Sequence, residues 1–440
     1  MTSSSLFEKL AELPRRAARG MRFGLERMEE ALDVLGRPHE RLAAVHVGGS
    51  NGKGSTSAMV ESIARAAGLR TGLYTSPHLC RYAERIRFDG EPIGDDALDR
   101  ALDAVFTRCR DDLTFFESLT LAAFYAFAEA DVDLVVLEVG LGGRLDATNV
   151  IHAPIATAIT TIALEHTEIL GDTLAAIARE KAGILKPGAP VVLGPLDPEA
   201  DQVIAAIAER ASAFPVTRVT RAALWEPGSL SARWDGATTE IVGPRTHDRV
   251  SVKLRLAGLH QAENAAVAVG LAHHLAESFP GRDLVAAIPA GLERTEWPGR
   301  LERIDRDGVT VILDCAHNPS GIEKLLLTLS TTWPGSTSPE RVALVFGALA
   351  DKRFADMLAL LAPIAARRYY AEPKGRPPAP RDELNKIAPG AAVPAPKEAI
   401  ARALAESRPG DTILVTGSIY LVGEIRAALL GIEADPIIAL

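Results

Sequence analysis

The sequence predicts an α/β protein built from two doubly wound domains, and two observations carry this prediction. Short, nearly continuous apolar runs alternate with helical segments from residue 43 onward, which is typical of parallel strands covered on both faces. A second series of the same kind begins after Pro298-Gly299. A chain of 440 residues also exceeds what one hydrophobic core usually holds, so two domains are expected.

The first 42 residues predict two short amphipathic helices, which end at Gly36 and Pro38. The first α/β series then follows. Its strands are expected at 43–47, 71–75, 134–138, 155–160 and 190–193. Its helices are expected at 117–129, 174–183, 199–211 and 262–277. Residues 215–256 alternate short β-like runs with turn signals and predict a small antiparallel patch.

The second series predicts strands at 309–314, 342–346, 368–370 and 412–416, with helices between them. We therefore divide the chain into an N-terminal domain over 1–292, a hinge over 293–299 and a C-terminal domain over 300–440. Ligands of doubly wound sheets bind beyond the carboxyl ends of the strands. The residues that follow those ends are the first candidates for function.

Composition limits the possible partners. Hydrophobic residues make up 47% and charged residues 24%, which is ordinary for a folded protein. A net charge of −9 argues against a broad basic face for nucleic acid. No apolar stretch approaches 18 residues, and the three cysteines lack CxxC spacing. We expect a cytoplasmic monomer with small-molecule substrates and neither nucleic acid nor membrane as partner.

The segment from Ala44 to Thr56 is the most informative one. An apolar run ends in a glycine cluster, Lys53 follows, and a helical pattern begins, as in a phosphate-binding loop. The match to G-x-x-x-x-G-K-[ST] is imperfect, because Val47 occupies the first glycine position and Gly54 displaces the hydroxyl to Ser55. The alternative is a structural turn between a strand and a helix.

Two polar residues follow other predicted strands. Glu138 ends a buried strand, where an acidic residue near a P-loop is typically a Mg²⁺ ligand; the alternative is a carboxylate that caps the next turn. Ser76 is either a metal ligand or a helix cap.

The remaining candidates have ordinary interpretations too. His166 is either a ligand or a satisfied structural histidine. Lys181 lies near the end of a predicted helix, where a solvated lysine that complements the helix dipole is expected. Asp314 and His317 form a polar cluster at a strand end, although aspartate also builds ordinary turns.

Together these segments resemble the folylpolyglutamate synthases and dihydrofolate synthases of the Mur ligase superfamily. The resembling pieces occur in the family's order over nearly the whole chain: Phe23–Met28, Gly49–Ser55, Tyr74–Leu79, Glu138–Asn149, Glu165–Glu168, Arg179–Ile184, His260-Gln261 with Asn264, Pro298–Arg300, Asp314–Pro319, Phe346–Lys352 and Thr416–Leu421. The resemblance implies an N-terminal P-loop ATPase-like domain and a C-terminal Rossmann-like domain. It implies an ATP-dependent ligase that joins L-glutamate to dihydropteroate and to reduced folates.

The resemblance also implies roles for residues. Those expected to bind ATP are Asn51, Gly52, Lys53, Gly54, Ser55, Asn264, Arg300, Asp314 and His317. Those expected to be catalytic are Lys53, Glu138, His166 and Lys181. The expected Mg²⁺ ligands are Ser76, Glu138, His166 and Lys181, the last as an N-carboxylysine. The expected pterin-binding residues are Thr114, Phe115, Phe116, Glu117, Leu145, Asp146 and Ala147. The implied cofactors are ATP, two Mg²⁺ ions and, as an option, a monovalent cation such as K⁺.

Three positions depart from the family's pattern. Glu165 replaces the usual aspartate, Cys315 replaces a small residue, and Gly49-Ser50 replaces Gly-Thr. Three alternatives to the bifunctional enzyme stay open: a monofunctional folylpolyglutamate synthase, a cell-wall muramyl amino-acid ligase, and a non-catalytic protein that closes on ATP.

Overall fold

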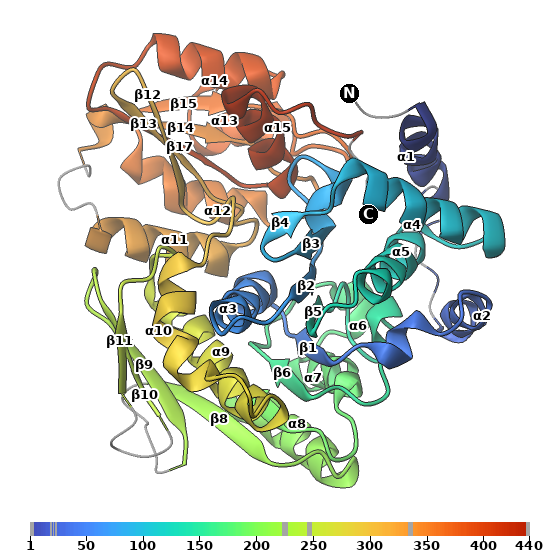
Figure 1. Cartoon of the computed structure of the whole chain (residues 1–440). Coiled ribbons are helices and arrows are strands. Elements are labelled where there is room, and N and C mark those ends of the chain that lie inside the picture. The colour runs from blue at the N-terminus through green and yellow to red at the C-terminus, as the bar shows by residue number, and fades with distance from the viewer. Residues whose placement is uncertain are drawn as a thin grey trace.

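The protein folds into two α/β domains, each organised around its own sheet (Figure 1). The computed structural model describes residues 4–17, 20, 22, 24–221, 228–243, 249–332 and 338–436. The prediction of two doubly wound domains is confirmed. The strands change sheet between residues 252 and 302. The exact limits 1–292, 293–299 and 300–440, and the role of 293–299 as a hinge, stay predictions.

The N-terminal sheet has a parallel centre with antiparallel additions at both edges. The strand order is β11-β10-β9-β8-β7-β6-β1-β5-β2-β3-β4. The parallel strands are β1 (Ala44–Gly48), β2 (Thr71–Tyr74), β5 (Leu134–Glu138), β6 (Ala156–Ile159), β7 (Val191–Leu193) and β8 (Val216–Arg221). The antiparallel strands are β3 (Ile86–Phe88) and β4 (Glu91–Pro92) at one edge, and β9 (Leu230–Trp234), β10 (Thr239–Val242) and β11 (Arg249–Val252) at the other.

The predicted antiparallel patch therefore exists, and it continues the main sheet because β8 pairs with β9 in parallel. Residues 222–227 and 244–248 of that region lie outside the described part of the chain. Strands β3 and β4 were not predicted. They are three and two residues long, and β4 contains Pro92, so no alternating pattern marks them.

Helices cover both faces of this sheet, as the apolar strands require. Val135 and Leu137 of β5 pack in one hydrophobic cluster, whereas Leu134 and Val136 pack in another on the opposite face. The first cluster includes α1 (Ser4–Ala17), α2 (Glu26–Val34), α4 (Asp95–Arg108) and α5 (Phe115–Glu129). The second includes α3 (Lys53–Ala66), α9 (Leu259–Ser278) and α10 (Leu284–Arg294). A third lies around α7 (Leu174–Lys181) and α8 (Pro198–Arg210).

The C-terminal sheet has the order β12-β13-β17-β14-β15-β16 and is parallel apart from the β12–β13 pair. Its strands are β12 (Glu302–Arg306), β13 (Val309–Leu313), β14 (Val342–Phe346), β15 (Arg367–Tyr370), β16 (Ala391–Ala392) and β17 (Thr412–Thr416). Its helices are α11 (Pro319–Thr332), α12 (Phe354–Leu361), α13 (Arg381–Ile387), α14 (Pro396–Ala405) and α15 (Ile419–Leu430). The unpredicted β12 is mostly charged and pairs only at the sheet edge.

Helix α10 packs very closely on α3, the helix that follows the glycine-rich turn. A Cβ added to Gly291 would lie 2.4 Å from Cα of Ile63, and Oγ of Ser62 donates a 2.7 Å hydrogen bond to the carbonyl of Gly291. The backbone of α3 is therefore fixed against α10 at a position where only glycine fits.

We expect Gly291→Ala to lower the free energy of unfolding by about 1–3 kcal/mol, because the added methyl group meets backbone that cannot move aside. Denaturant unfolding followed by fluorescence measures this. Gly281→Ala is the control, since nothing lies within 4 Å of its added Cβ. Equal stability of the two variants would contradict the close packing of α10 on α3.

Candidate active site

The glycine-rich turn joins β1 to the N-terminus of α3. Gly49 and Gly52 have φ values of 136° and 89°, which other residues rarely adopt. A Cβ on Gly52 would lie 2.2 Å from Oδ1 of Asn264 in α9. The Lys53 ammonium folds back over the turn and donates to the carbonyls of Gly49 (2.8 Å) and Ser50 (3.1 Å). The turn thus presents a cation at the N-terminus of a helix, which are the features of an anion site.

Glu138 and Ser76 come together at the carboxyl ends of β5 and β2. Oε2 of Glu138 accepts a 3.0 Å hydrogen bond from the backbone N–H of Ser76. Burial raises the pKa of Glu138, while Lys53 and Arg300 act to lower it. The carboxylate therefore binds the backbone of the loop after β2, and it also faces the cleft described below.

Lys181 is buried, with 2% of its surface exposed, so the expectation of a solvated lysine is wrong. Its ammonium donates to the carbonyl of Gly49 at 2.9 Å and pairs with Glu165 at 2.9 Å. Burial lowers the pKa of Lys181 to about 8, and Lys53 adds to this effect. Burial alone would raise the pKa of Glu165, but Lys53 and Lys181 bring it down to about 2. Sequence reasoning saw Glu165 only as a departure from a family pattern and missed this pairing.

His166 lies next in the chain, at the N-terminus of the short helix α6 (Thr167–Leu170). Its φ of 46° is left-handed. Its imidazole lines the cleft, and burial lowers its pKa, which favours the neutral ring that can act as a ligand.

The C-terminal domain contributes the opposite wall. Asp314 follows β13 and accepts hydrogen bonds from the N–H groups of Leu301 (3.0 Å) and Ala316 (2.9 Å). Burial raises the pKa of Asp314, and Arg300 opposes that shift. Nδ1 of His317 lies 2.9 Å from the carbonyl of Cys315, and burial lowers the pKa of this imidazole.

A cleft joins these groups, with about 1270 Å³ of space that is partly open to solvent. The predicted residues that line it are Asn51, Gly52, Lys53, Gly54, Ser55, Ser76, Glu138, His166, Asn264, Arg300, Asp314 and His317. Lys181 lies behind the Gly49 carbonyl and contacts the cleft through Glu165. Lining residues that sequence reasoning missed include Thr161, His260, Glu263, Asn318 and Lys324. Two of these residues carried a signal: Asn318 lies beside His317 in the polar cluster, and His260 lies in a segment that resembles the family.

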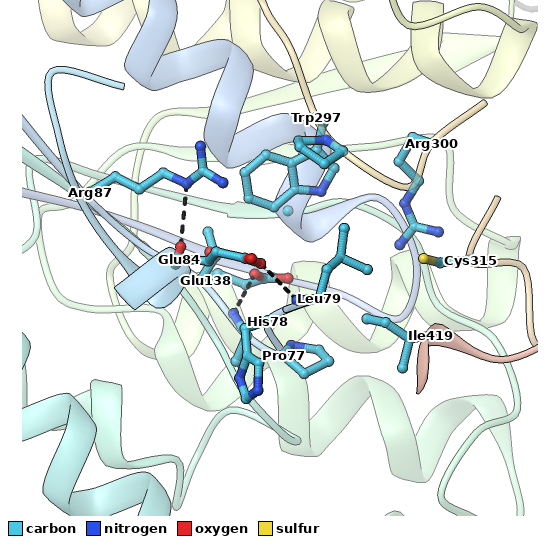
Figure 2. Close-up of a pocket in the computed structure, with 14 residues that line it drawn as sticks. Pro77, His78, Leu79, Glu84, Arg87, Glu138, Trp297, Arg300, Cys315 and Ile419 are labelled. Atoms are coloured by element: carbon cyan, nitrogen blue, oxygen red, sulfur yellow. Dashed lines mark hydrogen bonds between the residues drawn. The ribbon is translucent and has the colours of Figure 1, made fainter. Parts of the chain in front are cut away.

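A second cavity of about 540 Å³ shares Ser76, Glu138 and Arg300 with this cleft. Figure 2 shows the Trp297 indole between the guanidinium groups of Arg87 and Arg300. The Arg87 guanidinium lies 5.3 Å from the Trp297 ring centre. The two cavities meet at Glu138, so this carboxylate can face bound groups from both sides.

None of the predicted pterin-binding residues lines either cavity. Thr114 caps α5, and Glu117 completes this capping box while pairing with Arg27 at 2.8 Å. Asp146 caps a short 3-10 helix (Ala147–Val150) and accepts from the N–H of Leu141. Phe115 and Ala147 are buried, and Phe116 packs against the same hydrophobic cluster. A pterin role for the set Thr114, Phe115, Phe116, Glu117, Leu145, Asp146 and Ala147 stays a prediction.

The donor set fits a hard divalent cation. Glu138, a buried carboxylate that accepts a hydrogen bond from the Ser76 N–H, is the ligand type that Mg²⁺ prefers. Within the described residues, no group of three or more His, Cys, Asp and Glu side chains forms a metal cluster by itself. A cation bound here therefore needs the Ser76 hydroxyl, water or nucleotide oxygens in addition.

Comparison with known proteins identifies the family. The Mur ligase middle domain matches residues 47–272, and the Mur ligase, glutamate ligase domain matches residues 299–419. The dihydrofolate synthase/folylpolyglutamate synthase of Bacillus subtilis is 34% identical over 93% of this chain and 96% of its own length. The chain belongs to this Mur ligase family. The Escherichia coli protein of the same name is 32% identical over 97% of this chain and 96% of its own.

Solved structures of this family superpose on 98% of the chain. Escherichia coli FolC in complex with DHPP and ADP superposes with a TM-score of 0.84, 31% identity and 98% coverage of both chains. The bifunctional enzyme of Yersinia pestis complexed with AMPPNP and Mn ion superposes with a TM-score of 0.83 and covers 98% of this chain and all of that one. The family resemblance read from the sequence is thereby confirmed.

We expect Lys53→Ala and Glu138→Ala each to lower turnover at least about a hundredfold, because each removes about 3 kcal/mol or more of transition-state stabilisation. Steady-state ADP release measures this. The controls are Lys397→Ala and Glu129→Ala, which change exposed residues of the same types outside both cavities. Near-normal turnover in either site variant would show that the cleft is not the active site.

Proposed function

We infer that this protein is an ATP-dependent ligase that forms an amide bond between the α-amino group of L-glutamate and a carboxylate of 7,8-dihydropteroate or a tetrahydrofolate. ATP is converted to ADP and phosphate. The observation that carries this function is the cleft in which the P-loop and Glu138 of one domain face Arg300 and Asp314 of the other. Relatives that match the whole chain have the same activity in their names, and one of them was solved with ADP and DHPP.

The chemistry follows from the poor reactivity of a carboxylate as an acyl donor. An oxygen of the acceptor carboxylate attacks the γ-phosphorus in line, and ADP leaves with the bond electrons. The neutral amine of glutamate then attacks the acyl carbon of the acyl phosphate. Phosphate departs with the C–O electrons and takes up the proton that the nitrogen loses. The Lys53 ammonium, which lies over the glycine-rich turn, would stabilise the negative charge that accumulates on the phosphoryl oxygens.

The same residues account for the proposed cofactors. Asn51, Gly52, Gly54, Ser55, Asn264, Arg300, Asp314 and His317 hold ATP. Ser76, Glu138, His166 and a carboxylated Lys181 would hold two Mg²⁺ ions, which supply charge neutralisation on the phosphates. The acyl phosphate would react with water, so the cleft between the domains must exclude water while this intermediate exists. A K⁺ ion is an optional addition.

The proposed setting is the cytoplasm, with the protein as a monomer and no nucleic acid or membrane partner. Cys80, Cys109 and Cys315 are free thiols, which suits a reducing compartment. None of the described helices has the length and apolar character needed to cross a membrane.

The acceptor decides between the bifunctional and monofunctional forms. ADP release should require ATP, Mg²⁺ and L-glutamate, and should proceed with both 7,8-dihydropteroate and a tetrahydrofolate. Activity with the tetrahydrofolate alone would make the protein a folylpolyglutamate synthase. Activity with neither, but with a uridine-nucleotide muramyl peptide, would favour the cell-wall ligase. Absence of ADP release with every acceptor would overturn the proposed function.

The proposed carboxylation of Lys181 has its own test. Lys181→Ala should lose most activity and regain part of it when formate or acetate is added, because a small carboxylate fits the space that the side chain leaves. Lys186→Ala, a change in the same segment outside the cleft, should not respond to added acid. Full activity of Lys181→Ala, or a folded variant that no carboxylate restores, would contradict the role.

A further inference from the structure

The loop between β2 and β3, residues 75–85, carries Ser76 and is internally rigid. The Glu84 carboxylate accepts hydrogen bonds from the N–H groups of Leu79 (2.8 Å), Cys80 (3.0 Å) and Arg81 (3.0 Å). At the base of the loop, the N–H of Thr75 donates to the carbonyl of Arg85 at 3.0 Å. The loop therefore moves as one body, so a displacement of its tip (residues 80–82) also displaces Ser76.

Arg85 strengthens this connection. It is 1% exposed, its Nε donates to Nδ1 of His78 at 2.9 Å, and its guanidinium lies 4.9 Å from the centre of the Phe115 ring. His78 in turn packs edge-on against Tyr82, with ring centres 4.9 Å apart. The tip residue Tyr82 is thus linked through His78 and Arg85 to the base of the loop.

The C-terminal end of the chain holds that tip. After α15 the chain returns to the N-terminal domain, where the carboxylate of Asp435 accepts a 2.6 Å hydrogen bond from the N–H of Tyr82 (Figure 1). The N–H of Asp435 donates to the carbonyl of Cys80 at 2.9 Å, and the hydroxyl of Tyr82 donates to the carbonyl of Pro436 at 2.6 Å. Three hydrogen bonds thus join residues 435–436 to the tip.

Helix α15 packs against the same loop from another side. A Cβ on Gly423 would lie 2.2 Å from the carbonyl oxygen of Leu79, so the helix and the loop are in direct contact. The Sγ of Cys80 donates to the carbonyl of Gly423 at 3.5 Å. Any change in the placement of α15 must therefore change the contacts of the loop.

We propose that Asp435 is a positioning residue, which through Tyr82 holds the 75–85 loop so that Ser76 stays hydrogen-bonded to Glu138, and so couples the placement of the C-terminal domain to the active site. This inference rests on the proposed function for its kinetic consequence only. Asp435 contacts neither cavity and acts through the loop. The 75–85 loop carries none of the residues proposed to hold ATP, so its displacement affects turnover more than ATP affinity.

Asp435→Ala tests the proposal. It should lower kcat about tenfold, which is the loss expected from one hydrogen bond to a charged group, while the KM for ATP changes less than about twofold. Asp435→Asn keeps an oxygen acceptor for the Tyr82 N–H and should recover most of the turnover. Glu433→Ala removes the neighbouring exposed carboxylate of the same tail and serves as the control.

Hydrogen exchange of the protein without substrates gives a second readout. In Asp435→Ala, peptides that cover residues 75–81 should exchange faster than in Glu433→Ala, because the loop is released as far as the Ser76 N–H. Tyr82→Phe, which removes only the hydroxyl contact with Pro436, should shift exchange in the same direction by less. It also replaces Asp435→Ala if that variant fails to fold.

These outcomes distinguish the positioning role of Asp435 from the proposed function of the protein. Faster exchange confined to Tyr82, or a lowered melting temperature with unchanged kcat, would overturn the positioning role and leave a merely structural tail. Absence of acceptor-dependent ADP release by the native protein would overturn the proposed function, and the exchange comparison would still decide whether the tail controls the loop.

Discussion

The carbonyl oxygen of Gly49 is the point on which the active site depends. With Lys181 unmodified, both Lys53 and Lys181 donate to it, at 2.8 and 2.9 Å, so two ammonium groups approach one backbone acceptor. Their mutual repulsion is offset by Glu165, which pairs with Lys181. The arrangement requires the left-handed φ of Gly49 and its close approach to Thr160, where a Cβ would lie 2.0 Å from the Thr160 hydroxyl. A side chain at position 49 would displace the acceptor and both lysines.

The second constraint is that the site is divided between two domains. Asp314 ties the residue after Arg300 to the loop that follows β13, so the groups of the opposite wall are fixed to one another. Charged groups across a cleft with low exposure interact more strongly than in water, and their placement is accordingly sensitive to the orientation of the domains. Through the contact of Asp435 with Tyr82, the orientation of the domains affects the hydrogen bond between Ser76 and Glu138.

Particular residues show how far the sequence could lead. The runs in β5 and β14 are apolar at successive positions because both sheet faces are covered, and for this reason the strands and their carboxyl ends could be predicted from the sequence. Glu138 and Asp314 could be found as candidates for that reason. Lys181 could not be assessed in this way, because a lysine in the last turn of a helix has the same local sequence whether it faces solvent or the protein interior.

The sequence by itself determined the two α/β series, the glycine-rich turn and the order of the family's motifs, since these depend on local periodicity and on residues that only tight backbone geometry requires. Only the tertiary structure determined which polar and charged groups contact one another. Glu165 reaches Lys181, Asn264 reaches the turn at Gly52, and Asp435 reaches Tyr82 across 353 positions of sequence. Such pairings follow from the packing of elements that are distant in the sequence, and no local sequence pattern predicts them.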